Sequence, residues 1–399
     1  MDRSQTIGVF FGSRSPEHDI SIITAELVIA GLKGMGCRVL PVYLGKQGEW
    51  FIGEELGKLE TFTDPNKKNL AGKFSRYFLD LEKSVGKLVF RQKSLWGKTH
   101  VVNLAFPAFH GSFGEDGTIQ GLFEIFGVPY VGCDVTSSAI AMDKILTKQF
   151  YQQFSIPTTP FVHYSLEDWE RDREAVLRGI QQKLRFPLFV KPARLGSSIG
   201  VAKAKTEKEL ELSVETALHY GQRVLAEASV ENLADLTVAV LGNDDPRPSL
   251  IQESVFADEF FSYEDKYLRA GGAQLGKARR SVIIPARLDK KITETLQTLA
   301  VKIFKSLGCS GIARVDFLYD RKSQNYFANE VNTLPGTLYH HLWQKSGVSL
   351  EELLEKLLML AEERHQKNQR PAYTFASDIL RRTGGGKLPC AKLHGHGDI

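Results

Sequence analysis

Three features that mark membrane, secreted or nucleic-acid-binding proteins are scarce in this sequence. No stretch approaches the roughly 18 consecutive apolar residues of a membrane span, and the N-terminus lacks the apolar core of a signal peptide. Cysteine is rare, and none of the four cysteines forms a C-x-x-C pair. The 51 basic and 47 acidic residues nearly balance, so nothing favours nucleic acid as a partner. These absences predict a cytoplasmic protein with reduced, mostly buried cysteines.

The residues that are present predict more than one domain. With 399 residues and 42% apolar content, the chain is long enough for two or three domains, each with its own core. Apolar runs at 7–11, 38–44 and 101–106 alternate with loops and helical segments, which is the pattern of an open parallel α/β sheet. We therefore expect a Rossmann-like α/β domain over 1–140, with an insertion within 50–100.

The pattern changes near residue 141. Closely spaced short strands with few helices follow, which favours an antiparallel α+β arrangement. We expect a central unit over 141–226 and a C-terminal unit over 227–365. A final helix should begin at Ser349, where Glu352 completes a capping box. Residues 366–399 show little periodicity and are expected to form a mobile tail.

Four polar residues on two successive strands form the first candidate site. Arg314 and Asp316 alternate along one predicted strand, and Glu330 and Asn332 alternate along the next, so each pair faces one side. If the strands are neighbours, three oxygen ligands and a guanidinium converge. Mg²⁺ favours such a set of carboxylates and an amide. The alternative interpretation is a polar strand face turned to solvent.

Glycine-rich loops form the second group of candidates. In the segment 189–204 a strand delivers Lys191 to a Gly/Ser loop, whose backbone N–H groups could cradle phosphate. The segment does not match the Walker A pattern, and a plain hairpin turn is the alternative. The loops 12–21 and 110–117 each add a histidine and a carboxylate beside glycines at the end of a predicted strand.

The segment 262–281 is glycine-rich, basic and too irregular for a strand. A loop of this length inside a compact domain is usually functional or disordered. We expect a mobile lid that carries Lys266, Tyr267 and Arg279 and excludes water from a reactive phosphate. Solvated charge is the alternative.

Together these motifs resemble the D-alanine–D-alanine ligases of the ATP-grasp superfamily. The similarity covers roughly residues 5–45 and 100–350, and its most specific segments are GSRSPEHDIS, HGSFGEDGTIQGLFEIFGVPYVGCDVTSSAIAMDK, FVKPARLGSSIGV, YEDKY and RVDF…NEVNTLPG. Chance agreement over so many ordered blocks is implausible. The resemblance implies a fold of α/β and α+β type, an ATP-grasp fold preceded by the N-terminal α/β domain.

The resemblance also implies ATP and Mg²⁺, or Mn²⁺ in its place, as cofactors. The metal ligands would be Asp316, Glu330 and Asn332. The positions that match the family's ATP site are Lys144, Lys191, Ser197, Ser198, Glu227, Val230 and Asp235. In the family the two lysines and the serine loop hold phosphates, the next two positions bind adenine, and the last binds ribose.

For the first D-amino acid, the resemblance points to a pocket around Glu17. This carboxylate would receive the substrate's ammonium group, and Ser197 and Tyr267 would complete a hydrogen-bonded triad with it. His110 lines the same pocket in the family. All four positions follow from the resemblance and not from spacing.

For the second step, the resemblance implies that Arg314 and the backbone N–H of Gly336 stabilise an oxyanion. Lys266 and the residue at 341 would face the second substrate's carboxylate. His341 departs from the family, which has a small hydroxyl residue there. Ala228 replaces a lysine beside the adenine, and Asp235 shortens the ribose glutamate. ATP use survives these changes more easily than the identity of the second substrate.

The implied activity is ATP-dependent ligation of two D-alanines for peptidoglycan through an acyl phosphate, with release of ADP and phosphate. One alternative is a ligase whose second substrate is another amino acid, an amine or a hydroxy acid. Another is an inactive nucleotide-binding regulator, against which the full ligand set argues. The family also implies a homodimer acting on D-amino acids, without a membrane or nucleic-acid partner.

Overall fold

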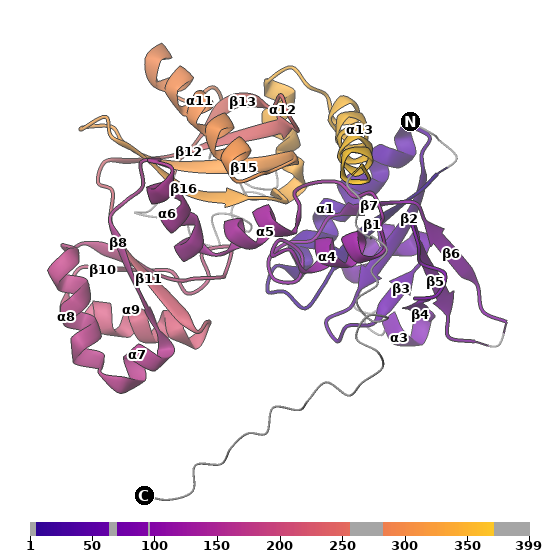
Figure 1. The fold of residues 1–399 in the computed structure, drawn as a ribbon, viewed down its shortest axis with the longest axis horizontal. Helices are drawn as coiled ribbons and strands as arrows, with labels where there is room; N and C mark the ends of the chain where they lie inside the picture. The colour runs from indigo at the N-terminus through magenta and orange to yellow at the C-terminus, as the bar shows by residue number, and fades with distance from the viewer. Residues whose placement is uncertain (1–4, 64–69, 95, 256–281, 371–399) are drawn as a thin grey trace, which may run out of the picture.

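Three β-sheets organise the chain (Figure 1). The computed structural model describes residues 5–63, 70–94, 96–255 and 282–370. These residues form a seven-stranded N-terminal sheet, a four-stranded central sheet and a five-stranded C-terminal sheet. The predicted change to antiparallel pairing is confirmed, because every strand pair of the central and C-terminal sheets is antiparallel.

The N-terminal sheet has a parallel centre. β1 (Thr6–Gly12) lies between β2 (Arg38–Leu44) and β7 (Leu104–Pro107) and pairs with both in parallel. α1 (His18–Gly34) packs on one face of β1 and α4 (Thr118–Ile125) on the other. Because helices cover β1 on both faces of the sheet, nearly all of its side chains are apolar. The predicted parallel α/β arrangement is therefore confirmed for these strands.

Within residues 50–100, where an insertion is expected, an antiparallel meander extends the same sheet. Its strands are β3 (Trp50–Ile52), β4 (Arg76–Leu79), β5 (Leu88–Gln92) and β6 (Thr99–Val102). Its short helices are η1 (Glu54–Gly57), α2 (Glu60–Thr63) and α3 (Leu70–Lys73). The sheet as a whole is thus mixed.

The prediction of one strand over 101–106 is wrong, because the run is divided between β6 and β7. The division falls at Asn103, which exchanges two hydrogen bonds with Thr6. The Asn103 N–H donates to the Thr6 carbonyl at 2.9 Å, and the Thr6 N–H donates to the Asn103 side chain at 3.0 Å. The chain leaves β5 at this point and continues alongside β1.

Helices pack against the central sheet, so the prediction of few helices there is wrong. The strands are β8 (Phe161–Ser165), β9 (Leu188–Pro192), β10 (Ala202–Ala204) and β11 (Arg223–Ala228). The helices are α7 (Leu166–Arg171), α8 (Arg173–Lys183) and α9 (Glu207–His219). Val176 and Ile180 of α8, and Leu210 and Val214 of α9, recur four residues apart and enter one buried cluster with the strands.

The predicted division between residues 226 and 227 falls inside β11. This strand pairs with β8 through Glu227 and with β9 through Ala228. We therefore propose that the central unit extends to residue 228.

The C-terminal sheet has an apolar face and a polar face. Its strands are β12 (Leu233–Gly242), β13 (Arg247–Ser254), β14 (Val282–Ile283), β15 (Gly311–Asp320) and β16 (Tyr326–Asn332). α11 (Lys290–Ser306) packs with Val238, Val315 and Phe317 in one cluster. Alternation places Thr237 and Asp316 on the opposite face. The predicted neighbouring strands β15 and β16 are therefore present, with one face free of the α11 core.

Two helices connect the N-terminal sheet to the central sheet. α5 (Val135–Met142) and α6 (Lys144–Gln153) are capped by Asp134 and Asp143, whose side chains accept backbone N–H groups of the first turn. Among the helices of the described ranges, none combines the length and apolar character needed to cross a bilayer.

The last helix, α13 (Leu350–Asn368), begins as predicted. The Ser349 side chain accepts from the Glu352 N–H, and the Glu352 side chain accepts from the Ser349 N–H, so the capping box is confirmed. The helix continues to Asn368, past the predicted start of the tail at 366. Residues 371–399 lie outside the described residues.

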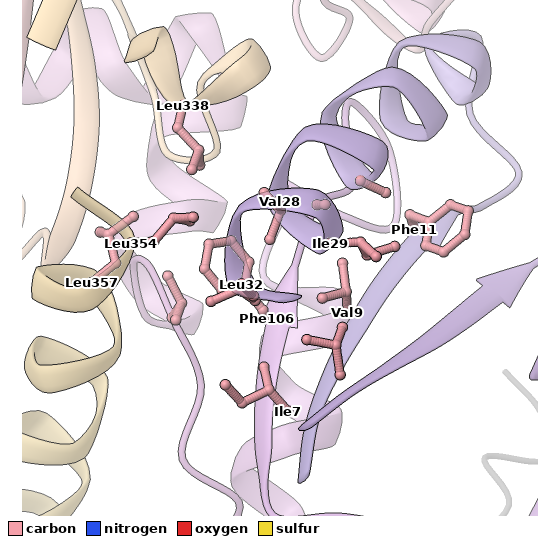
Figure 2. Packing of buried hydrophobic residues seen from close by; sticks show 14 of the residues in the cluster. Ile7, Val9, Phe11, Val28, Ile29, Leu32, Phe106, Leu338, Leu354 and Leu357 are labelled. Carbon is pink, nitrogen blue, oxygen red and sulfur yellow. The ribbon is translucent and has the colours of Figure 1, made fainter. Parts of the chain in front are cut away.

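α13 joins the C-terminal unit to the N-terminal sheet through one shared core (Figure 2). Leu354 and Leu357 pack in the same buried cluster as Val28 and Leu32 of α1. α1 comes so close at Gly31 that an added Cβ would lie 2.5 Å from Leu354 Cδ1. This core fixes the loops that precede α1 relative to the C-terminal sheet.

Leu357→Ala tests how much this core contributes to the stability of the protein. The side chain is fully buried, so its truncation should lower the free energy of unfolding by about 2–5 kcal/mol. Urea denaturation followed by tryptophan fluorescence measures the loss. Met359→Ala on the same helix, where the side chain is 51% exposed, is the control and should change the value by less than about 0.5 kcal/mol. Equal values for the two variants would contradict the shared core.

Candidate active site

β15 and β16 hold the four predicted metal-site residues side by side. Arg314 lies opposite Asn332, and Asp316 lies opposite Glu330. Directly opposed residues of antiparallel strands project from the same face, so the four side chains form one polar group. The structure therefore brings together all four residues of this candidate site.

Arg314 contacts both carboxylates of this group. Its Nη2 is 2.6 Å from Asp316 Oδ2 and 3.4 Å from Glu330 Oε1. Thr237 Oγ1 donates to Asp316 Oδ1 at 2.9 Å. Burial raises the pKa of Asp316 above its ordinary value. The Arg314 charge opposes this shift only in part, and the Glu330 charge adds to it. One cation faces two carboxylates, so a divalent cation would offset the remaining negative charge.

The donor chemistry of the group fits Mg²⁺. Asp316 and Glu330 provide hard carboxylate oxygens, and the Asn332 amide lies 3.4 and 3.5 Å from them. Within the ranges that the structure describes, no group of three His, Cys, Asp or Glu side chains could hold a metal ion. The Asn332 amide provides a further side-chain oxygen beside the two carboxylates.

A cavity opens over this group, between the central and C-terminal sheets. Part of its wall is apolar and is formed by Phe189, Val201, Ala228, Val230, Leu233 and Leu318. The rest is polar and includes Lys144, Lys191, Ser197, Ser198, Asp235, Arg314, Asp316 and Glu330. An apolar wall next to cations and carboxylates suits a flat base joined to phosphates. Every predicted ATP-site residue except Glu227 lines this cavity.

The loop after β9 has a backbone suited to phosphate. Ser197 and Ser198 have positive φ angles of 54° and 58°, and Gly200 has a φ of 71°. Successive residues of this kind turn their N–H groups into a concave anion site. Lys144 Nζ donates to the Leu195 carbonyl, which attaches the lysine to the same loop.

Glu227 faces two lysines and not the cavity. Its carboxylate is 2.7 Å from Lys148 Nζ and is also paired with Lys191. Sequence reasoning missed Lys148. Its position four residues after Lys144, on the same face of α6, was the available signal.

Glu17, at the N-terminus of α1, faces a second and smaller cavity. Ser197 Oγ donates to Glu17 Oε1. Two glycines leave space for this carboxylate, since a Cβ at Gly111 or Gly196 would lie 2.7 or 2.4 Å from Glu17 Oε2. The N-terminal loop and the Gly/Ser loop thus meet at one carboxylate.

Glu115 lies in the same cavity and was not among the predicted site residues. It accepts a hydrogen bond from the Gly111 N–H at 2.7 Å. Burial raises the pKa of Glu115 to about 8, and the charge of Glu17 acts in the same direction. Its place in the segment HGSFGEDG was the signal that could have identified it. Two adjacent carboxyl groups in one cavity suit an ammonium ligand.

His110 lines neither cavity. Its Nε2 is 2.8 Å from Thr24 Oγ1, which also accepts from the Thr337 N–H at 3.1 Å. Burial lowers the pKa of His110 to about 4, and Arg314 adds to the effect. A neutral His110 is thus connected, through Thr24, to the segment that follows Pro335.

That segment is η5 (Gly336–Tyr339). Its first residue, Gly336, is the one whose backbone N–H is predicted to stabilise an oxyanion. Thr337, Leu338 and Tyr339 all have positive φ angles, between 48° and 57°. Three consecutive non-glycine residues in this region are strained unless packing holds them, and all three are buried. The Tyr339 ring lies 5.0 Å from Arg314 Cζ and lines the larger cavity.

His341, in α12 (His340–Lys345), also lines neither cavity. Its Nε2 is 2.7 Å from Gln252 Oε1, and its buried Nδ1 has no hydrogen-bond partner among the described residues. Burial lowers the pKa of His341 to about 4, and His340 adds to the effect. Gln252 lies opposite Thr237, so His341 is attached to the cross-strand row that contains Asp316. Lys266, Tyr267 and Arg279 lie outside the described residues.

Two family models match the chain. The model for the D-ala D-ala ligase N-terminus matches residues 6–133, and the model for the D-ala D-ala ligase C-terminus matches residues 150–359. Together they cover the predicted N-terminal domain and almost all of the following two units.

Individual relatives agree. A D-alanine–D-alanine ligase of Natranaerobius thermophilus is 34% identical over 93% of this chain and 98% of its own, and one of Thermosipho melanesiensis is 38% identical over 90% and 94%. The solved D-alanine–D-alanine ligase of Coxiella burnetii superposes with a TM-score of 0.77 at 29% identity, over 92% of this chain and 96% of its own. The VanG D-Ala:D-Ser ligase of Enterococcus faecalis gives 0.74 at 32% identity, over 90% and 99%. The chain therefore belongs to the D-alanine–D-alanine ligase family, with its ATP-grasp fold.

Proposed function

We propose that the chain is an ATP-dependent ligase that joins two D-alanines and supplies D-alanyl-D-alanine for peptidoglycan. The observation that carries this proposal is that the two cavities share walls, since Lys144, Ser197, Arg314 and Glu330 line both. The phosphate end of a nucleotide in the larger cavity would meet an amino-acid carboxylate in the smaller one. The similarity to D-alanine–D-alanine ligases over 90–93% of the chain supports the same reaction.

The chemistry explains why the cavities have to join. A carboxylate does not acylate an amine at neutral pH, because oxide is a poor leaving group. Transfer of the γ-phosphoryl group of ATP to the carboxylate of the first D-alanine gives an acyl phosphate and releases ADP. Lys144, Lys191 and Arg314 would offset the charge that spreads over the phosphoryl oxygens.

The amino-acid substrates would be held by the N-terminal loops and the Pro-Gly segment. Glu17 and Glu115 would bind the ammonium group of the first D-alanine. When the amine of the second attacks, Arg314 and the Gly336 N–H would stabilise the tetrahedral oxyanion. Tyr267 and Lys266 belong to the same proposal on the strength of the sequence resemblance.

Asp316, Glu330 and Asn332 would hold Mg²⁺, and Mn²⁺ accepts the same oxygen donors. When bound, such an ion neutralises and orients the phosphates. We also infer a cytoplasmic location, where ATP is available and the buried thiols of Cys133 and Cys309 stay reduced. By family analogy we propose a homodimer.

A second candidate is a ligase with the same first substrate and a different second one. His341, a neutral imidazole where the family has a small hydroxyl residue, favours it. The similarity to a D-Ala:D-Ser ligase shows that relatives of this fold include such an enzyme by name. Phosphate release with D-alanine alone, compared with D-alanine plus D-serine, D-lactate or an amine, separates the candidates.

Glu330→Gln tests the metal site. The variant loses one negative charge from the proposed Mg²⁺ ligands, so turnover should fall at least about 100-fold. Coupled-assay turnover at saturating substrates measures this, and Glu355→Gln on the exposed side of α13 is the matched control. Near-normal turnover in Glu330→Gln would place the metal elsewhere.

Glu115→Gln tests the carboxyl pair of the smaller cavity. In the free protein, Glu115 should ionise as the pH rises through about 8, and its charge then attracts the substrate's ammonium group. The dissociation constant of D-alanine should therefore fall between pH 6.5 and 9, by at most about tenfold per pH unit. Calorimetry in the presence of a non-hydrolysable ATP analogue measures it. The glutamine variant should show a flat profile, and a persistent slope would exclude Glu115 as its source.

His341→Ser tests the second substrate. With a pKa near 4, the imidazole is neutral from pH 6 to 9, so wild type and variant should show parallel pH profiles of the second KM. The serine variant should nevertheless change the ratio of KM for D-alanine and D-serine at that position by at least about threefold. His219→Ser, exposed at the end of α9, is the control. If variant and wild type agree in both ratio and profile, His341 has no part in substrate choice.

A further inference from the structure

Lys148 is a fully buried lysine that the proposed reaction does not use. Only 1% of its surface is exposed, and it lines neither cavity. Its Nζ lies 2.7 Å from Glu227 Oε2, 2.9 Å from Thr158 Oγ1 and 2.8 Å from Thr159 Oγ1. An ammonium group has three protons, so three acceptors satisfy it completely.

Glu227 stands between Lys148 and the cavity-lining Lys191. One carboxylate oxygen faces Lys148 and the Thr159 hydroxyl, which donates at 2.7 Å, and the other is paired with Lys191 Nζ. Lys191 also lies 3.4 Å from Asn329 Oδ1, next to the proposed metal ligand Glu330. The order from the interior to the cavity is therefore lysine, glutamate, lysine.

The charges of this row do not cancel. Two ammonium groups and one carboxylate leave one positive charge, and the only member that lines a cavity is Lys191. Burial alone would raise the pKa of Glu227, but the two lysines hold it below its ordinary value. Burial opposes a charge on Lys191 as well, yet its pKa is raised, with Glu227 as the main cause. Burial lowers the pKa of Lys148, and the Glu227 charge opposes this shift. The three oxygen acceptors around Lys148 Nζ are the set that an ammonium group requires.

We propose that Lys148 is a positioning residue for nucleotide binding, which compensates Glu227 so that the charge of Lys191 is available to phosphate. Without Lys148, Glu227 and Lys191 would form a neutral buried pair, and moving Lys191 toward a phosphate would leave the carboxylate uncompensated. An uncompensated buried charge is strongly unfavourable. With Lys148 in place, Glu227 keeps a partner when Lys191 turns to the ligand. The inference rests on the proposed ATP-dependent reaction.

Lys148→Met tests the proposal. Its dissociation constant for Mg·ADP, measured by calorimetry, should be at least about tenfold higher than that of wild type. Binding of adenosine, which carries no phosphate, should be unchanged within about twofold. Wild type that does not bind Mg·ADP would refute the proposed function itself. Wild-type affinity in a folded Lys148→Met variant would overturn only the role of Lys148.

The double variant Lys148→Met/Glu227→Gln separates charge compensation from a purely structural role. Removal of both charges leaves Lys191 cationic without a competing carboxylate, so Mg·ADP affinity should return to within about threefold of wild type. A structural role predicts no recovery, because the double variant removes more native contacts. Double-variant binding as weak as that of Lys148→Met would overturn the proposal. If Lys148→Met does not fold, Mg·ADP binding is measured on the double variant alone. Weak binding by the folded double variant would then overturn the proposal.

Discussion

The register of three antiparallel strands is the constraint on which the site depends. In β12, β15 and β16, Thr237, Asp316 and Glu330 lie directly opposite one another. A slip of one residue would turn a carboxylate into the apolar cluster beneath α11 and expose Val315 or Phe317 in its place. Apolar packing on one face of the sheet therefore determines the geometry of the charges on the other.

Charge balance explains how the two sides of the larger cavity complement each other. The group around Arg314 contains two carboxylates and retains negative charge, whereas the row of Lys148, Glu227 and Lys191 retains positive charge. Buried ions are tolerated only when they are paired and hydrogen-bonded, which both groups are. The net positive charge on one side of the cavity suits phosphates, and the net negative charge on the other side suits a divalent cation bound to them.

Much of the fold follows from local patterns. Alternation predicted β15 and β16, and the Ser349–Glu352 capping box predicted the start of α13, because each pattern involves residues only a few positions apart. The division at Asn103 was missed, because the hydrogen bonds that cause it reach back to Thr6. The helices α8 and α9 were missed although their four-residue apolar spacing is visible along the chain.

The sequence by itself determined the family, the ATP-grasp fold and the spacing of the proposed metal ligands, because strand alternation and motif order are properties of short segments. Only the tertiary structure decided how the buried ionisable groups behave. Each of three groups has a partner far away in the sequence: Glu115 near Glu17 is 98 positions from it, His341 against Gln252 is 89, and Lys148 behind Glu227 is 79. Their protonation depends on desolvation and on charges from distant segments, and both arise only when the three sheets pack together.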